Sequence, residues 1–134
     1  MKLAPIALVG ATLVGAMAPA LAANAAPLKP GLPSDQCFYS RDMRNHTILD
    51  NHTMLVDVAG RYVYRITMSG ACLAGAVSSD PIITRQPPGS SHICRPIDMD
   101  IAIGGRGIPT PCIVQSIARL TPAEVAAIPP RKRP

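Results

Sequence analysis

Hydrophobic and polar residues alternate in two neighbouring segments near the middle of the chain. In residues 53–58 and 62–68, hydrophobic side chains occupy every second position, and Gly60 lies in the short connection between them. Successive side chains of a strand point to opposite faces, and a short glycine-containing connection is typical of a β-hairpin. The pattern therefore predicts two paired antiparallel strands with one buried face. The hydrophobic positions are Met54, Val56, Val58, Tyr62, Tyr64, Ile66 and Met68.

A second alternating segment begins at His92 and reaches residue 103. Pro96 lies inside it, so we expect a bend, a bulge or an edge position, because proline has no backbone N–H to donate. Residues 81–85 are predicted to form a short edge strand, and residues 112–120 a further strand. The positions that the pattern places on one face of the second segment are Ile93, Arg95, Ile97, Met99, Ile101 and Ile103.

A helix signal follows the last predicted strand. Thr121 and Glu124 have the spacing of a capping box, in which each side chain accepts a hydrogen bond from the backbone N–H of the other residue, and Pro122 stands at the first helical position. A short helix is expected to end near Ile128, before two prolines. Together these elements predict a mostly β fold: a small antiparallel rolled sheet or barrel of about four to five strands with a short C-terminal helix and two disulfides.

The N-terminus has the features of a cleavable signal peptide. Lys2 precedes a long uncharged apolar stretch, which ends in small residues at alternating positions, a pattern typical of a signal peptidase site. Cleavage is expected after Ala22, with Ala25 as the alternative, so that the protein is periplasmic or secreted and keeps no stable membrane anchor. The predicted organisation is a signal peptide at 1–22, a Pro-rich flexible leader at 23–36, a single β-rich domain at 37–128 and a basic Pro-rich tail at 129–134.

The charge of the chain does not change the predicted class of protein. The formal net charge is +5, but the excess of Lys and Arg lies at the two ends of the chain, and residues 34–130 contain equal numbers of basic and acidic side chains. A nucleic-acid-binding domain concentrates basic residues on its folded face, usually among aromatic residues. With one Phe, three Tyr and no Trp in the chain, no nucleic-acid partner is expected.

Four cysteines are spread widely along the predicted domain: Cys37, Cys72, Cys94 and Cys112. In an exported protein, an even number of cysteines predicts disulfides, each contributing about 3–4 kcal/mol to stability. Zinc ligation and redox activity favour closely spaced pairs, which this sequence does not have. Three pairings are open, of which Cys72–Cys94 and Cys37–Cys112 are preferred because they would join strand to strand and the N-terminal arm to the last strand.

The densest polar cluster follows the first cysteine and contains Arg41, Asp42, Arg44 and His46. We interpret it as a possible recognition loop. The alternative is a set of local salt bridges and turn hydrogen bonds that order the N-terminal arm. The segment 45–50 is nearly repeated at 51–55, and the first copy is expected in a loop while the second enters a strand.

Catalytic and metal-binding residues are not predicted. His46, His52 and His92, together with the methionines, suggest periplasmic copper. However, Met54, Met68 and Met99 fall on hydrophobic strand faces, where filling gaps in the core is the ordinary role of methionine. No serine, threonine or cysteine has a recognisable nucleophile context beside a histidine and an acid. The sequence therefore predicts a protein without cofactor or enzymatic activity.

Several short motifs resemble a family of small exported proteobacterial proteins with four cysteines, a domain of unknown function. The resemblance spans residues 37–134, and His46 departs from it because an aromatic residue is expected at that position. It implies export and a disulfide-bonded domain but no activity. The motifs are Cys37–Asp42, Val63–Ile66, Cys72–Leu73, Ile93–Asp98, Pro111–Val114 and Leu120–Glu124.

The protein is expected to act by binding rather than by catalysing a reaction. The preferred hypothesis is a non-enzymatic binding or structural module of the cell envelope, whose partner is an unknown protein or envelope component. One alternative is an inhibitor of an extracytoplasmic hydrolase, which would present residues 41–46 or 104–111 as a rigid loop. The other alternative is periplasmic copper binding.

Overall fold

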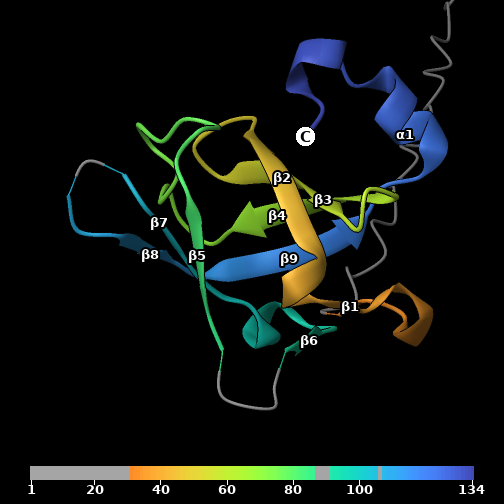
Figure 1. The fold of residues 1–134 in the computed structure, drawn as a ribbon, viewed down its shortest axis with the longest axis horizontal. Coiled ribbons are helices and arrows are strands. Elements are labelled where there is room, and N and C mark those ends of the chain that lie inside the picture. The colour runs from red at the N-terminus through yellow and green to blue at the C-terminus, as the bar shows by residue number, and fades with distance from the viewer. Residues whose placement is uncertain (1–30, 87–90, 106) are drawn as a thin grey trace, which may run out of the picture.

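The computed structural model describes residues 31–86, 91–105 and 107–134. Within these ranges, nine strands form three antiparallel sheets, and the chain also has one short α-helix and four short 3-10 helices (Figure 1). The predicted mostly β class with a C-terminal helix and two disulfides is confirmed. The sheets do not close into a barrel, and the strands are more numerous than predicted. The predicted signal peptide at 1–22 and the leader as far as residue 30 lie outside the described residues.

The largest sheet has four strands in the order β2-β3-β4-β9. Its centre is the predicted hairpin of β3 and β4, in which Met54 pairs with Ile66. Ala59 and Gly60 both have left-handed backbone, with φ of 58° and 69°, and two successive residues of this kind match the twist of the strands that a tight turn joins. The strands are β2 (Met43–Ile48), β3 (Thr53–Val58), β4 (Tyr62–Met68) and β9 (Val114–Arg119).

Two smaller sheets complete the fold. The three-stranded sheet has the order β5-β7-β8, so the predicted strand near residues 81–85 does lie at an edge. The two-stranded sheet pairs β1 with β6, each two residues long. Their bounds are β1 (Phe38–Tyr39), β5 (Ile82–Arg85), β6 (His92–Ile93), β7 (Asp100–Ile103) and β8 (Thr110–Cys112).

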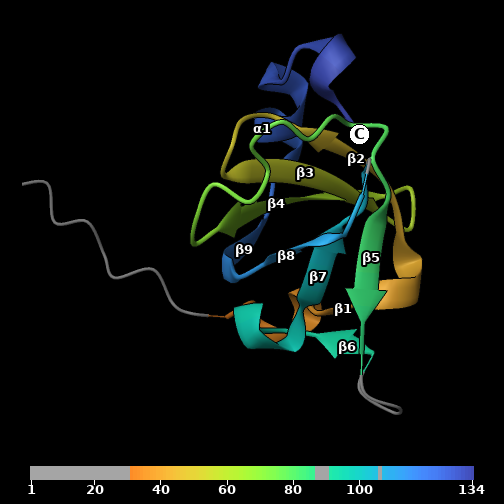
Figure 2. The same cartoon turned by 90° about the vertical axis from the view of Figure 1, so that its left-hand side faces the viewer.

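The predicted C-terminal helix is α1 (Pro122–Ala127), and its capping box is confirmed. Glu124 N donates to Thr121 Oγ1 at 3.2 Å, and Thr121 N donates to Glu124 Oε2 at 2.8 Å. The helix lies at the opposite end of the molecule from the β1–β6 sheet (Figure 2). The two ends therefore present separate surfaces. The 3-10 helices are η1 (Ser34–Gln36), η2 (Ser40–Asp42), η3 (Pro96–Asp98) and η4 (Pro130–Lys132).

A single hydrophobic core joins the three sheets. Most positions that the alternation placed inside are buried, whereas Tyr62 is 47% exposed. The Phe38 ring from β1 lies against the Tyr64 ring from β4, with centroids 4.5 Å apart, and this contact anchors the smallest sheet to the largest. Three methionines fill the core, as their alternation predicted. The core residues are Phe38, Met54, Val56, Val58, Tyr64, Ile66, Met68, Leu73, Ile93, Met99, Ile101, Ile103, Cys112, Val114 and Ile117.

The predicted recognition loop at 41–46 is not a loop. Arg41 and Asp42 lie in η2, and the chain then enters β2, an edge strand. The first copy of the repeat was also predicted in a loop, and this is wrong because it forms β2, with Thr47 opposite Leu55. Pairing with β3 supplies the hydrogen bonds that hold this polar strand in place, and the strand's own sequence does not reveal such a partner.

The second alternating segment is interrupted at Pro96. The chain turns through η3, and Ile97, which was predicted to face the core, is 82% exposed. The Asp98 carboxylate accepts a hydrogen bond from Arg95 N at 2.8 Å and closes this turn. A 3-10 turn has three residues in each turn rather than the two-residue period of a strand. Ile97 is therefore rotated out of the face that the pattern assigned to it.

The preferred cysteine pairing is wrong. The bonds are Cys37–Cys94 and Cys72–Cys112. The first closes the β1–β6 sheet, and the second ties the connection after β4 to the end of β8.

Two disulfides fit an oxidising, extracytoplasmic compartment. In the described part of the chain, no helix has the length and apolar character needed to cross a membrane.

Peptide mapping tests the pairing directly. Trypsin cuts this sequence so that each cysteine lies in a different peptide. Under non-reducing conditions, mass spectrometry should find the peptide with Cys37 linked to that with Cys94, and the peptide with Cys72 linked to that with Cys112. Thiols blocked with an alkylating reagent before digestion control for exchange. Peptides linked through Cys72 and Cys94 would contradict the fold described here.

Candidate functional site at the β1–β6 disulfide

The β1–β6 sheet is a ribbon of two residue pairs, Phe38 with Ile93 and Tyr39 with His92. Cys37 and Cys94 occupy the next position of the same register. Their Cα atoms are 4.6 Å apart, which is the spacing of directly opposed residues in antiparallel strands. A ribbon this short is not stable in water by itself. The disulfide therefore adds a covalent link to a ribbon that its own backbone pairing would not hold together.

The ribbon has a buried face and an exposed face. Phe38 and Ile93 point inward and are 5% and 0% exposed. Because side chains alternate along a strand, the remaining four residues share the outer face. The inner face anchors the ribbon to the core, and the outer face presents its side chains to solvent. The outer residues are Cys37, Tyr39, His92 and Cys94.

Three exposed side chains stack on this outer face. The Tyr39 and His92 rings have centroids 5.0 Å apart, and the Arg41 guanidinium carbon lies 4.6 Å from the centroid of the Tyr39 ring. A guanidinium at this distance from an aromatic face makes a cation–π interaction. Tyr39 remains 41% exposed and the Arg41 side chain 74% exposed. We call these residues the Arg41–Tyr39–His92 stack.

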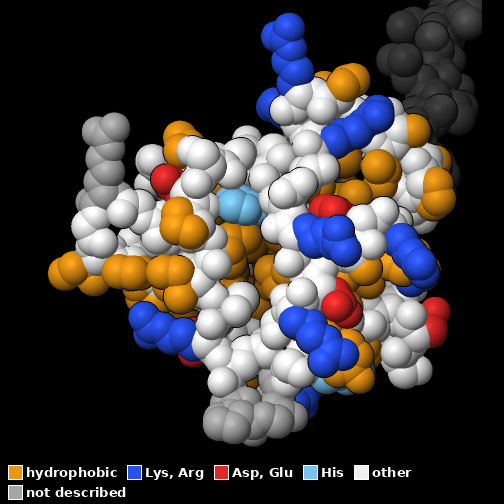
Figure 3. Space-filling model, viewed as in Figure 1, with side chains coloured by type: hydrophobic (Ala, Val, Ile, Leu, Met, Phe, Trp, Pro, Cys, Tyr) orange, Lys and Arg blue, Asp and Glu red, His pale blue; other side chains and the backbone are white. Residues whose placement is uncertain are grey.

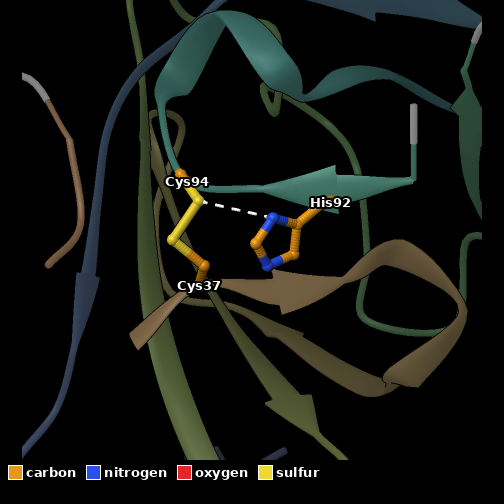
Figure 4. Close-up of side chains that lie close together, drawn as sticks. All are labelled: Cys37, His92 and Cys94. Atoms are coloured by element: carbon orange, nitrogen blue, oxygen red, sulfur yellow. Dashed lines mark hydrogen bonds between the residues drawn. A yellow bond between two sulfur atoms is a disulfide. The ribbon is translucent and has the colours of Figure 1, made fainter. Parts of the chain in front are cut away.

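His92 also contacts the disulfide. Its Nδ1 lies 3.7 Å from Cys94 Sγ (Figure 4), and the ligand atoms of Cys37, His92 and Cys94 are within 4.8 Å of one another. Both sulfurs are bonded to each other, so neither is a thiolate, and Nδ1–H can only donate weakly to sulfur. The group has the chemistry of a soft-metal site, but that chemistry is available only when the disulfide is reduced.

Asp98 supports the stack from η3. Its Oδ2 accepts hydrogen bonds from Cys94 N at 3.2 Å and Arg95 N at 2.8 Å, and its Oδ1 accepts one from Arg95 Nη2 at 2.9 Å. The Arg95 guanidinium is the main group that holds the pKa of Asp98 below its ordinary value of 3.8, and the backbone N–H groups add to this effect. The carboxylate therefore fixes the backbone of Cys94.

A second set of hydrogen bonds fixes η2, which carries Arg41. Ser40 N donates to Ser91 O at 2.9 Å, and Ser40 Oγ donates to Gln86 Oε1 at 2.8 Å. Gln86 in turn donates from Nε2 to Asp98 O at 3.4 Å. These hydrogen bonds join Ser40, next to β1, to residues that flank β6, and so fix the position of the segment that carries Arg41.

The structure separates the four residues of the predicted recognition loop. Arg41 belongs to the stack, and Asp42 Oδ1 lies 3.9 Å from Arg41 Nε. Arg44 is exposed on β2. His46 is half-buried, and its Nε2 has no hydrogen-bond partner among the described residues. Burial lowers the pKa of His46, and the neighbouring Asp80 opposes this effect.

Tyr39 and His92 were not predicted as site residues. Each lies two positions from a cysteine of the same disulfide, Tyr39 after Cys37 and His92 before Cys94. This symmetric spacing is a signal in the sequence, but it has meaning only once the two cysteines are known to pair. With either of the other two pairings, no bond would bring the segments of Tyr39 and His92 together.

Comparison with known proteins identifies no relative. No family model, no curated protein and no solved structure matches this chain. The resemblance to a family of small exported proteins therefore rests on the sequence motifs alone, and function is argued from the geometry of the site.

Replacing Asp98 by alanine should destabilise the domain, because four N–H groups, those of Cys94 N and of Arg95 N, Nε and Nη2, lose a charged acceptor. We expect the free energy of unfolding at pH 7 to fall by about 1–3 kcal/mol. The pKa of Asp98 is lowered in the folded state, so its contribution is present above pH 3.8 and is lost as the pH falls through the lower folded value.

Urea denaturation at pH 7 and at several pH values below 4 measures this effect. The Asp98→Ala protein should lose less stability in acid than the wild type. Asp100→Ala, which changes an exposed carboxylate on neighbouring β7, is the matched control and should leave stability at pH 7 nearly unchanged. Equal stability of the Asp98→Ala and wild-type proteins at pH 7 would contradict the supporting role of Asp98.

Proposed function

We propose that this protein is a non-enzymatic binding module, exported to the periplasm, that recognises a protein partner through the Arg41–Tyr39–His92 stack. The observation that carries the proposal is the stack itself: Tyr39 and His92 are exposed on a ribbon that a disulfide closes, and Arg41 from the adjoining η2 contacts the Tyr39 ring. The proposal includes removal of the signal peptide after Ala22. The two disulfides support export, because such bonds persist in oxidising compartments.

The residue types of the stack suit protein recognition. Tyrosine and arginine are enriched among the residues that dominate binding energy at protein interfaces. Side chains that are already ordered have less conformational entropy to lose on association. The Tyr39 ring contacts both the His92 ring and the Arg41 guanidinium. The stack is therefore preorganised as the centre of an interface.

The charge of the stack indicates the partner's chemistry. Asp42 approaches Arg41 only at Nε, at 3.9 Å, and both side chains are well exposed. A pair of this kind contributes little to stability, so the guanidinium keeps donors for a partner. A carboxylate next to an aromatic or aliphatic side chain would fit, because the carboxylate can bind Arg41 while the apolar group packs on Tyr39.

The state of the cysteines supports a non-enzymatic role. All four are in disulfides, so none offers a thiol nucleophile. The histidine nearest to a sulfur, His92, contacts a disulfide rather than a hydroxyl or thiol. In its oxidised form this corner of the molecule is suited to contact a partner rather than to transfer a group.

A second candidate function is inhibition of an extracytoplasmic hydrolase. The segment between β7 and β8 carries Ile108, which is 95% exposed, and the Cys72–Cys112 bond fixes its end. An exposed apolar side chain on an anchored segment is a feature of inhibitory loops. Assays of the purified domain against a panel of lysozymes and proteases test this function. Inhibition that Ile108→Ser abolishes would favour it over the preferred function, and no inhibition of any enzyme would exclude it for that panel.

Site-specific photo-crosslinking in the native host tests the preferred function. A photoreactive phenylalanine analogue at Tyr39 should give a discrete crosslinked product of higher mass, which mass spectrometry can identify. The same analogue at Ile113, which is 77% exposed, is the matched control and should give no such product. Absence of a product at position 39, or the same products at both positions, would contradict the proposal.

Binding of the identified partner then tests the role of the guanidinium. Arg41→Ala should weaken binding by about ten- to a hundredfold, as expected for a central interface arginine. Arg44→Ala removes the same charge from exposed β2, outside the stack, and should change the affinity by less than about threefold. Equal losses of affinity for the two variants would contradict the role of the stack, because net charge alone would then account for the binding.

A further inference from the structure

A groove lies at the other end of the molecule, between the large sheet and α1. Its volume is about 630 Å³, and its lining comes from the β3–β4 turn, β4, β9, α1 and the C-terminal segment. Volumes of about 300–1,000 Å³ are typical of small-molecule sites. In the space-filling view, Lys and Arg side chains lie beside hydrophobic side chains around α1, at the upper right (Figure 3). The groove therefore combines size, charge and apolar surface.

Three arginines from distant parts of the chain line this groove: Arg61, Arg119 and Arg133. The lining contains no Asp or Glu among the described residues. The acids closest in the chain are engaged elsewhere or lie outside the lining. Glu124 is bound to Thr121 in the capping box, and Asp35 lies beside the lining residue Gln36. The groove is thus cationic although the domain as a whole is nearly balanced in charge.

Two of the arginines are held in place by the fold. The Arg119 guanidinium carbon lies 4.9 Å from the centroid of the Tyr62 ring, which is itself 47% exposed. Arg133 donates from Nε to Ile128 O and from Nη2 to Ala126 O, both at 2.9 Å, and so caps the carbonyl end of α1. Among the described residues, its Nη1 has no recorded acceptor. These cations are preorganised, which reduces the entropy lost when an anion binds.

Apolar side chains form the rest of the lining. None of the six residues of α1 is buried, so the side chains of the helix remain accessible beside the groove. Pro122, Val125 and Ala126 line the groove from the helix, and Leu120 from the end of β9. A ligand with an apolar part would cover these side chains, while its anionic part reached the arginines.

We propose that this groove binds a small organic acid with an aliphatic body, such as a medium-chain fatty acid. Its carboxylate would lie between the guanidinium groups of Arg61 and Arg119, and its chain would run along Pro122 and Val125. The charge complementarity and the size of the groove select this ligand class. The groove contains no residue of the Arg41–Tyr39–His92 stack. A test of acid binding in the groove is therefore independent of a test of the proposed partner binding.

Calorimetric titration of the disulfide-bonded mature chain, residues 23–134, with decanoate below its micellar concentration tests the proposal. We expect saturable binding of one decanoate per chain. Acetate, which has the charge without the chain, and a decanoyl glucamide, which has the chain without the charge, should each bind at least about tenfold more weakly. Equal binding of the uncharged amphiphile, or many decanoates per chain, would overturn the proposal.

Variants of the groove locate the site. Arg119→Gln should weaken decanoate binding about tenfold, and Arg119→Lys, which keeps the charge, should weaken it less. Arg65→Gln, on the same sheet but outside the lining, is the matched control and should bind as the wild type does. Thermal unfolding of each variant verifies the fold. Equal loss in the Arg65 and Arg119 variants, or tighter binding of an acidic peptide than of decanoate, would overturn the proposed site or its ligand class.

Discussion

The Cys37–Cys94 bond is the constraint on which the exposed surface of this protein depends. It joins two strands of two residues each, which have too few hydrogen bonds to stay paired alone. By fixing the register, it brings Tyr39 opposite His92 and leaves Phe38 to pack on Tyr64. A crosslink over this sequence separation stabilises the folded state by about 4 kcal/mol in the chain-entropy picture. That is a large part of the total stability of a small domain, about 5–15 kcal/mol.

The second disulfide has a different role, which concerns the arrangement of the sheets. Cys72 follows β4 of the four-stranded sheet, and Cys112 ends β8 of the three-stranded sheet. Neither sheet alone encloses a core, and their inner faces share one set of buried side chains. The domain has few aromatic residues to bury, so covalent links replace part of the packing that a larger core would supply. The result is a small scaffold that carries the Arg41–Tyr39–His92 stack at one end and the arginine-lined groove at the other.

Both ends present arginines that the fold has already positioned. At one end Arg41 lies on Tyr39, and at the other Arg119 lies on Tyr62. In each case a half-exposed tyrosine from a strand supports a guanidinium, which stays accessible while the number of its conformations is reduced. The two proposals differ in the surroundings of these pairs. The first is an open face beside a disulfide, suited to a protein surface, and the second is a groove with apolar walls, suited to a small amphiphilic acid.

The sequence by itself determined the elements whose cause is local. Alternating side chains and the glycine of the turn predicted the β3–β4 hairpin, and the capping box of Thr121 and Glu124 predicted α1, because these signals act between residues close in the chain. Tertiary structure decided the rest. Pairing with β3 made a strand of polar β2, and a 3-10 turn exposed Ile97. The packing of the three sheets around one core decided which cysteines met. Each of these depends on residues far apart in the sequence that only the folded chain brings together, and the stack and the groove arise from the same long-range contacts.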